Sequence, residues 1–322
     1  MTNDGEKLKV LVTGGGGFIG SHVVDECLRR GYEVAIVDKD PRFHAKQKES
    51  LRENKLCGLD GGATLYHYDI TNMAQLRLVF QTVAPDYVFH LAALPRVQYS
   101  IEHPEETHRV NVDGTHNVLL CAKEFGAKGV IYSASSSAYG DQDVMPLCEG
   151  MMPNPLSPYA LQKYVGELLC RQFALHYGVK TVALRYFNVY GSRMDPAGAY
   201  ALVIGRFLKL RKEGKAMTIT GDGEQTRDFT HVMDVVNANL LAMEAIETGR
   251  AGAGEVVNIG YGHSASVNRI AELIGGPVEY IPARLEPKHT LANRTLAKKL
   301  LGWEPRVALE YGIEGLKKEW GL

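Results

Sequence analysis

Short apolar runs alternate with helical patterns through the first half of the chain. The runs cover residues 10–12, 34–37, 64–68, 87–91, 129–132 and 181–186. Alternation of this kind predicts parallel strands joined by helical crossovers. Several of the runs are apolar throughout, which is typical of strands covered on both faces. We therefore expect an α/β fold built on a doubly wound parallel sheet, with its ligands at the carboxyl ends of the strands.

The first run ends in a glycine-rich turn, and a helical pattern begins directly after it. Gly14, Gly17 and Gly20 have the spacing Gly-x-x-Gly-x-x-Gly. The first two permit a tight turn and a close approach of ligand to backbone, and the third lets the helix pack on the strand. Such a turn presents bare N–H groups and a helix N-terminus to a pyrophosphate. A flexible loop is the alternative interpretation.

The second run supports nucleotide binding, because it ends at Asp38, 18 residues after Gly20. An acid at this point accepts hydrogen bonds from both hydroxyls of an adenosine ribose and repels a 2′-phosphate. The order of strand, turn, helix, strand and acid therefore predicts a dinucleotide site, for NAD rather than NADP.

The composition of the sequence changes after Asn188, where turn-forming residues become frequent and the predicted elements become shorter. Helical patterns occur at about 201–213, 232–248, 266–274, 293–301 and 308–319. We expect residues 1–187 to form an NAD-binding domain and residues 188–322 a smaller α/β domain that binds the substrate. In an alternative division, about 228–262 returns to the first domain.

Composition and charge exclude several functions. The 322 residues are 45% apolar and 23% charged, as in globular proteins, and a net charge of −1 gives no case for nucleic acid or an anionic membrane. The five cysteines are scattered and lie apart from the histidines, so we expect a reducing compartment and no metal site. The N-terminus lacks the apolar core of a signal peptide, and no run reaches membrane-spanning length. We expect a cytoplasmic protein.

Tyr159 and Lys163 form the candidate catalytic pair. Ser157 is suited to cap a helix and Pro158 to begin it, so Tyr159 lies in the first turn and Lys163 on the same face. A free tyrosine has a pKa near 10, and ionisation at pH 7 needs roughly 4 kcal/mol of help. One positive charge about 5 Å away, at an effective dielectric constant of about 20, supplies roughly 3 kcal/mol. Tyr159 is therefore a candidate general base, and an ordinary exposed pair is the alternative.

Ser135 joins this pair as a candidate, because it follows the strand at 129–132 and can hydrogen-bond the same substrate oxygen. The glycine spacing, this serine and Tyr-x-x-x-Lys together resemble the extended short-chain dehydrogenase/reductase family. Residues 184–191 (Leu-Arg-Tyr-Phe-Asn-Val-Tyr-Gly), with Gly-Asp-Gly at 221–223 and Arg-Asp-Phe at 227–229, are similar to nucleotide-sugar 4-epimerases. The resemblance covers nearly the whole chain.

The resemblance implies a Rossmann-type sheet, tightly bound NAD, a UDP-sugar substrate, and a homodimer packed through helices at about 104–125 and 157–177. It implies cofactor contacts from Gly14, Gly17, Phe18, Ile19, Gly20, Asp38, Asp69, Ile70, Leu91, Ala92, Ala93, Asn111, Ser133, Tyr159, Lys163 and Tyr186. It implies substrate contacts from Ser135, Ser136, Asn188, Tyr200, Ala201, Arg227, Phe229, Arg284 and Thr290.

The family mechanism agrees with this local chemistry. The tyrosine takes the proton of the sugar's 4-hydroxyl while hydride leaves carbon 4 for the nicotinamide. The 4-keto sugar then turns about its diphosphate linkage and receives hydride on the opposite face. By resemblance, Asn188, Arg227 and Arg284 grip the diphosphate and uridine, and two arginines suit a diphosphate bound by a protein of neutral overall charge. Surface salt bridges are the alternative role for these arginines.

Related activities are distinguished by the residues before Tyr139. Sugar 4,6-dehydratases resemble this chain but carry Asp-Glu there, and UDP-glucuronate decarboxylases usually carry a Glu. Here the corresponding residues are Ser136 and Ser137. Because serine cannot replace an acid as proton donor, we do not expect dehydration. A non-catalytic dinucleotide-binding protein is the alternative from another class, which loss of the serine, tyrosine or lysine would favour; this chain has all three.

In the family that this chain resembles, the sugar preference depends on a gate residue. Residues 194–201 are similar to epimerases of N-acetylated UDP-hexosamines, and Thr290 falls where a tyrosine would restrict the site to plain hexoses. A small gate admits a 2-acetamido group, so UDP-GlcNAc/UDP-GalNAc is the expected pair. The segment 284–289 is one residue shorter than the family pattern and lacks its Asp, which bears on the ribose contact and on the gate. UDP-glucose/UDP-galactose is the next alternative, and then UDP-glucuronate, with Arg193, Lys288 or His289 at the carboxylate.

Overall fold

The computed structural model describes residues 7–39, 62–196, 202–283 and 288–322. Within them the chain forms two compact units. The first comprises Met1–Ala134, Ser157–Leu184 and Asn239–Val256, and the second comprises Ser135–Leu156, Arg185–Ala238 and Val257–Leu322. The domain boundaries expected from the sequence stay a prediction.

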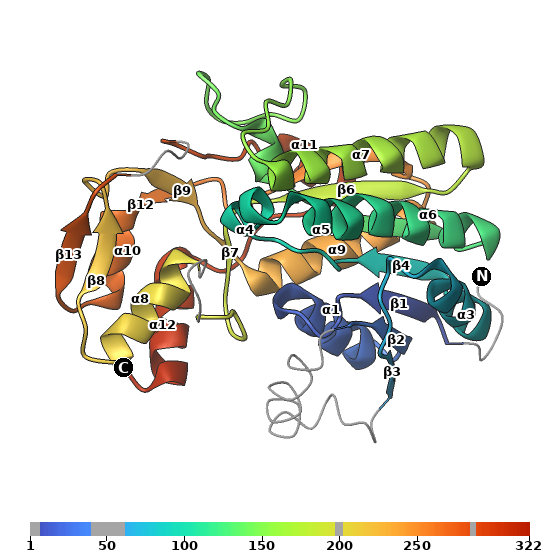
Figure 1. Ribbon diagram of the computed structural model, residues 1–322, viewed down its shortest axis with the longest axis horizontal. Coiled ribbons are helices and arrows are strands. Elements are labelled where there is room, and N and C mark those ends of the chain that lie inside the picture. Colours follow the sequence, from blue (N-terminus) through green and yellow to red (C-terminus); the bar gives the residue numbers. More distant parts are fainter. Residues whose placement is uncertain (1–6, 40–61, 197–201, 284–287) are drawn as a thin grey trace. The chain divides into compact units, whose positions relative to one another are not determined.

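A seven-stranded sheet organises the fold, with strand order β11-β6-β5-β4-β1-β2-β3 (Figure 1). The strands are β1 (Lys9–Thr13), β2 (Glu33–Val37), β3 (Ala63–Tyr66), β4 (Tyr87–His90), β5 (Gly129–Ser135), β6 (Thr181–Tyr186) and β11 (Ala253–Ile259). Register pairs run parallel from β3 through β2, β1 and β4 to β5. The predicted doubly wound, Rossmann-type α/β fold is confirmed.

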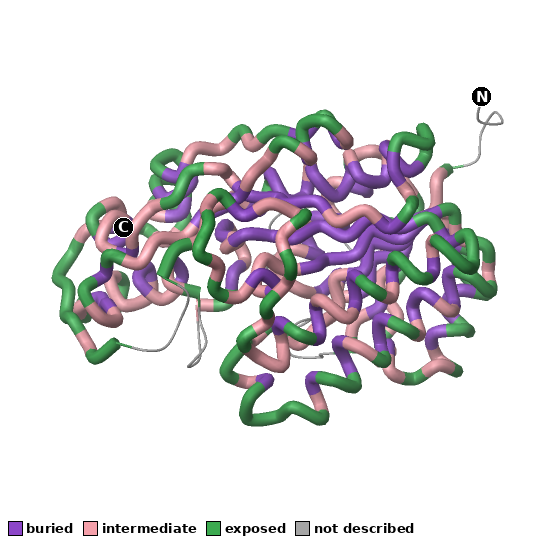
Figure 2. The backbone as a smooth tube through the Cα atoms, turned by 90° about the horizontal axis from the view of Figure 1, so that it is seen from above, coloured by how far each residue is buried: buried purple, intermediate pink, exposed green. Residues whose placement is uncertain are grey.

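Helices cover both sides of this sheet. They are α1 (Phe18–Arg29), α3 (Met73–Val83), α4 (Val97–Glu102), α5 (Pro104–His108), the π-helix η1 (Arg109–Asp113), α6 (Gly114–Glu124), α7 (Pro158–Tyr177) and α9 (Val232–Glu247). Figure 1 shows α6 and α7 on one side and α1 on the other. The buried residues follow the strands between these layers, as Figure 2 shows. Val10, Leu11 and Val12 of β1 are fully buried, as expected for a strand covered on both faces.

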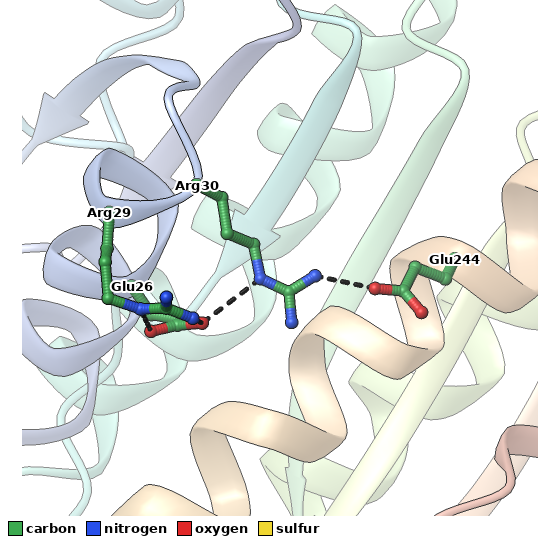
Figure 3. A network of polar contacts seen from close by, with 4 residues as sticks. All are labelled: Glu26, Arg29, Arg30 and Glu244. Carbon is green, nitrogen blue, oxygen red and sulfur yellow. Dashed lines mark hydrogen bonds and ion pairs between the residues drawn. The ribbon is translucent and has the colours of Figure 1, made fainter.

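An ion-pair network joins α1 to α9 (Figure 3). Arg30 donates from Nε to Glu26 Oε1 at 3.1 Å and from Nη1 to Glu244 Oε1 at 2.6 Å, and Arg29 also pairs with Glu26. These groups are partly exposed, so each ion pair contributes little to the free energy of folding. The network mainly holds the end of α1 next to the end of α9.

Two strand ends differ from the sequence expectation by two residues or more. β5 continues past Tyr132 to Ser135, because Ser133 and Ala134 are small enough to stay buried in the strand. β3 ends at Tyr66 rather than at residue 68, since the N–H of Tyr68 donates to the Tyr66 carbonyl and turns the chain out of the ladder.

The second unit contains shorter elements. They are the 3₁₀ turn η2 (Ser136–Tyr139), β7 (Val189–Tyr190), α8 (Val203–Lys212), β8 (Met217–Thr220), β9 (Thr226–Asp228), β10 (Thr230–His231), β12 (Ser264–Ser266), α10 (Val267–Ile274), β13 (Val278–Ile281), α11 (Thr295–Leu301) and α12 (Leu309–Trp320). The strands pair in twos, β7 with β10, β9 with β12 and β8 with β13. Among the described helices of both units, none has the length and apolar character that crossing a bilayer requires.

Candidate active site

The glycine turn is as tight as its spacing predicts. Gly14 has φ +70°, and a Cβ there would lie 2.6 Å from the backbone nitrogen of Ala92. A Cβ on Gly20 would lie 2.1 Å from the Gly14 carbonyl oxygen. Helix α1 begins directly after Gly17, which has no side chain to cap it. The first turn therefore has no side-chain cap on its N–H groups, which suits it to bind a diphosphate, and the turn fits a dinucleotide.

Asp38 follows β2 and lies against this turn. Its Oδ2 accepts a hydrogen bond from the Gly16 N–H at 2.9 Å, so the carboxylate sits beside the expected diphosphate position. Asp69, which follows β3, accepts from the Thr71 N–H at 2.9 Å and pairs with Lys39 at 3.2 Å. Burial raises the pKa of the Asp69 carboxyl, but these two partners outweigh it and leave the pKa below its ordinary value.

The segment after β4 is held by a buried histidine. The Leu91 N–H donates to the Thr13 carbonyl at 3.0 Å, and Thr13 Oγ1 lies 2.7 Å from His90 Nδ1. His90 Nε2 lies 2.9 Å from Thr115 Oγ1 at the start of α6. Burial, with a contribution from Lys163, lowers the pKa of His90 to about 3, so the ring is neutral. This neutral ring ties residues 91–93, expected to contact the cofactor, to β1 and α6.

Helix α7 places Tyr159 and Lys163 as its sequence predicts. Ser157 Oγ caps the helix by accepting from the Ala160 N–H, Pro158 is its first residue, and Gly178 ends it with φ +70°. The Tyr159 N–H donates to Ser100 Oγ of α4 at 3.0 Å, which fixes the first turn.

Lys163 is a buried ammonium. Its side chain is 4% exposed, and Nζ donates to the Ser133 carbonyl of β5 at 2.7 Å and lies 5.1 Å from the centre of the Tyr132 ring. Burial lowers the pKa of Lys163 to about 8, although Cys170 and Glu167 oppose this shift. The charge that the proposed base needs is therefore held next to β5 by the helix itself.

Ser135 ends β5 and begins the second unit. Its Oγ accepts from the Ser137 hydroxyl at 2.9 Å and from the Ser137 N–H at 3.2 Å. An oxygen that accepts twice in this way keeps its own proton for an acceptor elsewhere. The arrangement suits Ser135 to donate to a substrate oxygen.

Three of the predicted substrate residues meet in the second unit. Asn188 has φ +23° and donates from Nδ2 to the Asp228 carbonyl at 3.3 Å and to Thr290 Oγ1 at 3.5 Å. Arg227 donates from Nη1 to the carbonyl oxygens of Thr226 at 2.9 Å and Lys288 at 3.2 Å. Asn188, Arg227 and Thr290 therefore lie around one strand, β9.

The other predicted residues are placed as follows. Phe229 (5% exposed), Tyr186 (8%) and Ile70 (4%) are buried, and Phe18 and Ile19 are partly buried at the start of α1. Tyr200, Ala201 and Arg284 lie outside the described residues. Within the described ranges no group of three or more His, Cys, Asp or Glu side chains is suited to a metal ion.

Sequence reasoning missed Asp228 and Gln162. Asp228 is fully buried and accepts N–H bonds from Tyr261, Gly262 and Ala292 at 2.6–3.0 Å, while burial raises the pKa of its carboxyl. Gln162 is 3% exposed on α7. The available signal was a polar residue at an inward position of an amphipathic element, which predicts a buried hydrogen-bond partner.

Comparisons with known proteins identify the family of this chain. The model of the NAD dependent epimerase/dehydratase family matches residues 10–260. The structure of a UDP-glucose 4-epimerase from Thermotoga maritima, with UDP-glucose, is 38% identical, has a TM-score of 0.84, and matches over 96% of this chain and 99% of that one. A UDP-N-acetylglucosamine 4-epimerase from Methanobrevibacter ruminantium, in complex with UDP-N-acetylmuramic acid, is 34% identical, with a TM-score of 0.85 over 98% and 100%.

A UDP-glucuronate 4-epimerase from Thermodesulfobacterium geofontis is 36% identical over 313 residues, which cover 94% of this chain and 93% of that protein. The chain belongs to the NAD dependent epimerase/dehydratase family. It is an enzyme, and NAD is its cofactor, as the glycine turn and Asp38 predicted.

The buried ammonium predicts a pH dependence of stability. Because the pKa of Lys163 is lower in the folded protein than the ordinary 10.5, the unfolded chain binds more protons between about pH 8 and 10.5. The unfolding free energy of the wild type should therefore rise with pH across this window, relative to Lys163→Met, by on the order of 3 kcal/mol. Urea unfolding at several pH values measures it, with the exposed Lys318→Met as control. A pH-independent difference would contradict the burial argument.

Proposed function

We propose that this NAD-dependent UDP-sugar 4-epimerase interconverts UDP-GlcNAc and UDP-GalNAc. The observation that carries the proposal is the short Thr290 side chain beside Asn188, the residue expected to contact the substrate diphosphate. A tyrosine at this gate would fill the space that a 2-acetamido group needs, whereas threonine leaves that space open. The 34% identical UDP-N-acetylglucosamine 4-epimerase supports the same choice of sugar.

The backbone on both sides of the gate is held by β9. The Thr226 N–H donates to the Lys288 carbonyl at 3.0 Å, and the Thr290 N–H donates to the Thr226 carbonyl at 3.1 Å. His289 Nδ1 also lies 2.9 Å from Thr226 Oγ1. The position of Thr290 is therefore set by pairing with β9, whatever the length of the segment before it.

Each catalytic side chain has a proton-handling role in this proposal. NAD held at the glycine turn would supply a reversible hydride acceptor for carbon 4 of the sugar. Tyr159 takes the proton of the 4-hydroxyl and gives it back to the 4-keto sugar, and the ammonium of Lys163 favours the phenolate. Ser135 donates a hydrogen bond to the same oxygen. Asn188 and Arg227 hold the diphosphate while the sugar turns, with Arg284 and residues 200–201 as further proposed contacts.

The remaining site residues have supporting roles. Gly14, Gly17 and Gly20, with Phe18 and Ile19, would hold the cofactor diphosphate at the start of α1. Asp38 would accept from the adenosine ribose, and Asp69 and Ile70 would flank the adenine. Residues 91–93, Asn111, Ser133 and Tyr186 would line the rest of the cofactor site, and Ser136 and Phe229 the substrate site.

UDP-glucose/UDP-galactose is the second candidate pair, favoured by the 38% identical structure with UDP-glucose. UDP-glucuronate is the third, favoured by the 36% identical relative. It needs a cation at the sugar carboxylate, for which Arg193, Lys288 or His289 would serve.

A substrate panel with a gate variant tests the choice of sugar. We expect wild-type protein to epimerise UDP-GlcNAc in preference to UDP-glucose and UDP-glucuronate, with products resolved by NMR. Thr290→Tyr should lower turnover of UDP-GlcNAc roughly 10- to 200-fold and keep that of UDP-glucose, because the ring fills the acetamido space. Thr290→Ser, which keeps the hydroxyl, is the matched control. A wild-type preference for UDP-glucose would overturn the gate argument.

The role of the phenol has its own test. Tyr159→Phe removes only the hydroxyl and should lower kcat about 10²- to 10⁴-fold, because the general base is lost. The helix cap and the Tyr159 N–H bond to Ser100 remain, so NAD should still bind, as calorimetry can measure. Retained activity would show that Tyr159 is not the base.

We also propose that the enzyme is a homodimer assembled through α7. Leu161, Leu168 and Leu175 are 50%, 43% and 69% exposed and lie seven residues apart, so they form one apolar stripe. Helix α6 packs beside α7, with Lys123 Nζ 4.4 Å from the centre of the Tyr177 ring. A second copy of the same helix pair would cover the stripe.

Leu168→Glu should therefore convert the dimer to a monomer, because it places a charge in the centre of the stripe. Light scattering after size-exclusion chromatography measures the mass. Leu78→Glu, on α3 and equally a surface leucine at 50% exposure, is the matched control and should leave the mass unchanged. A wild-type monomer, or loss of dimer in both variants, would refute this assembly.

A further inference from the structure

Two buried side-chain amides form a bridge inside the first unit, which we call the amide bridge and which consists of Asn111 and Gln162. They are 1% and 3% exposed. Asn111 Nδ2 donates to Gln162 Oε1 at 2.8 Å, although the two residues are 51 positions apart. The bridge therefore joins the π-helix η1 to the catalytic helix α7.

Each end of the amide bridge reaches a part of the site. Asn111 accepts from the Leu94 N–H at 2.8 Å and donates to the Leu94 carbonyl at 3.2 Å, so it holds the segment that follows residues 91–93. Gln162 lies one residue before Lys163 and three after Tyr159. We call residues 91–94 the cofactor segment. Two side chains thus connect this segment to the catalytic helix α7.

The orientation of both amides is determined by their partners. Asn111 can donate to Gln162 only if Gln162 turns its oxygen inward, and this directs Gln162 Nε2 to Thr107 Oγ1, 3.0 Å away. The Thr107 hydroxyl in turn donates to the carbonyls of His103 at 3.0 Å and Pro104 at 3.2 Å. Reversing either amide would oppose two donors in a buried site, which is costly.

Asn111 lies in an unusual stretch of backbone, a π turn. Residues 109–113 form a π turn between two α-helices, and such turns occur frequently at functional sites. Within the same turn, the Asn111 carbonyl accepts from Thr115 Oγ1 at 2.7 Å, and Thr115 lies 2.9 Å from His90 Nε2. The π turn therefore connects the amide bridge to the buried histidine behind the cofactor segment.

We propose that Gln162 is a positioning residue for hydride transfer. Through Asn111 it fixes the separation between the segment at 91–94 and helix α7, so that the nicotinamide and the Tyr159 phenol stay aligned on one sugar carbon. This inference rests on the proposed epimerase function. Alignment matters because reacting atoms must be held about 3–3.5 Å apart.

Kinetics and amide exchange together test the proposal. Gln162→Leu should lower kcat at least 10-fold, leave KM for the UDP-sugar within about twofold, and raise the isotope effect of deuterium at carbon 4, because hydride transfer becomes slower than product release. Hydrogen exchange at the Leu94 N–H should accelerate, because Asn111 loses its partner. Gln81→Leu, at an exposed glutamine of α3, is the matched control and should change none of these quantities.

A glutamate variant separates positioning from packing. Gln162→Glu keeps the shape, but only its protonated carboxyl can donate to Thr107 as the amide does. Its kcat, taken as a ratio to the wild type at each pH, should rise as the pH falls, because the ratio removes the titrations that both proteins share. A flat ratio would count against the proposal.

The remaining outcomes of these experiments distinguish a positioning role of Gln162 from a purely structural one. A Gln162→Leu protein with lower thermal stability but unchanged kcat and unchanged Leu94 exchange would overturn the inference. If that variant fails to fold, Thr107→Val, which removes the hydroxyl that accepts from Gln162, is judged by the same two readouts. If the wild type turns over no UDP-hexose, the proposed function fails by itself. Exchange at Leu94, measured with and without NAD, then still shows whether Gln162 controls the cofactor segment.

Discussion

The buried ammonium of Lys163 is the interaction on which the rest of the site depends. Removing a charge from water is expensive, so the fold must supply partners at fixed positions. Ser133 supplies a carbonyl and Tyr132 a ring face, both from β5, while Glu167 lies one helical turn further along α7. Since both strand partners belong to β5, helix and strand can pack in only one register.

Local signals explain why much of the first unit could be predicted. The cap at Ser157, the proline after it and Gly178 act within a few residues of their own helix, so α7 follows from the sequence alone. The glycine turn is similar, because φ +70° at Gly14 is a property of that residue and its immediate neighbours. The end of β5 was harder to predict, because the serines after Tyr132 are small hydroxyl residues that suit both turns and buried strands.

The parts that escaped prediction depend on partners distant in sequence. Gln162 finds Asn111 across 51 residues, and Asp228 collects N–H groups from segments 33 and 64 residues away. An inward polar position can mark each of these residues as buried, but it does not indicate which distant residue is the partner. The π turn at 109–113 was equally hidden, since its residues fit a continuous helical pattern. Spatial context, rather than propensity, selects these features.

The pairing of Thr290 with β9 separates the location of the proposed gate from its chemistry. The two hydrogen bonds that define its place come from backbone atoms of Thr226, one to Thr290 itself and one to Lys288. Any residue that tolerates an extended backbone can make them. In the proposed site, a substitution at Thr290 would therefore alter which sugars enter and leave the proposed nucleotide contacts unchanged. In the proposed site, one side chain can change the sugar preference while the backbone that carries it stays the same.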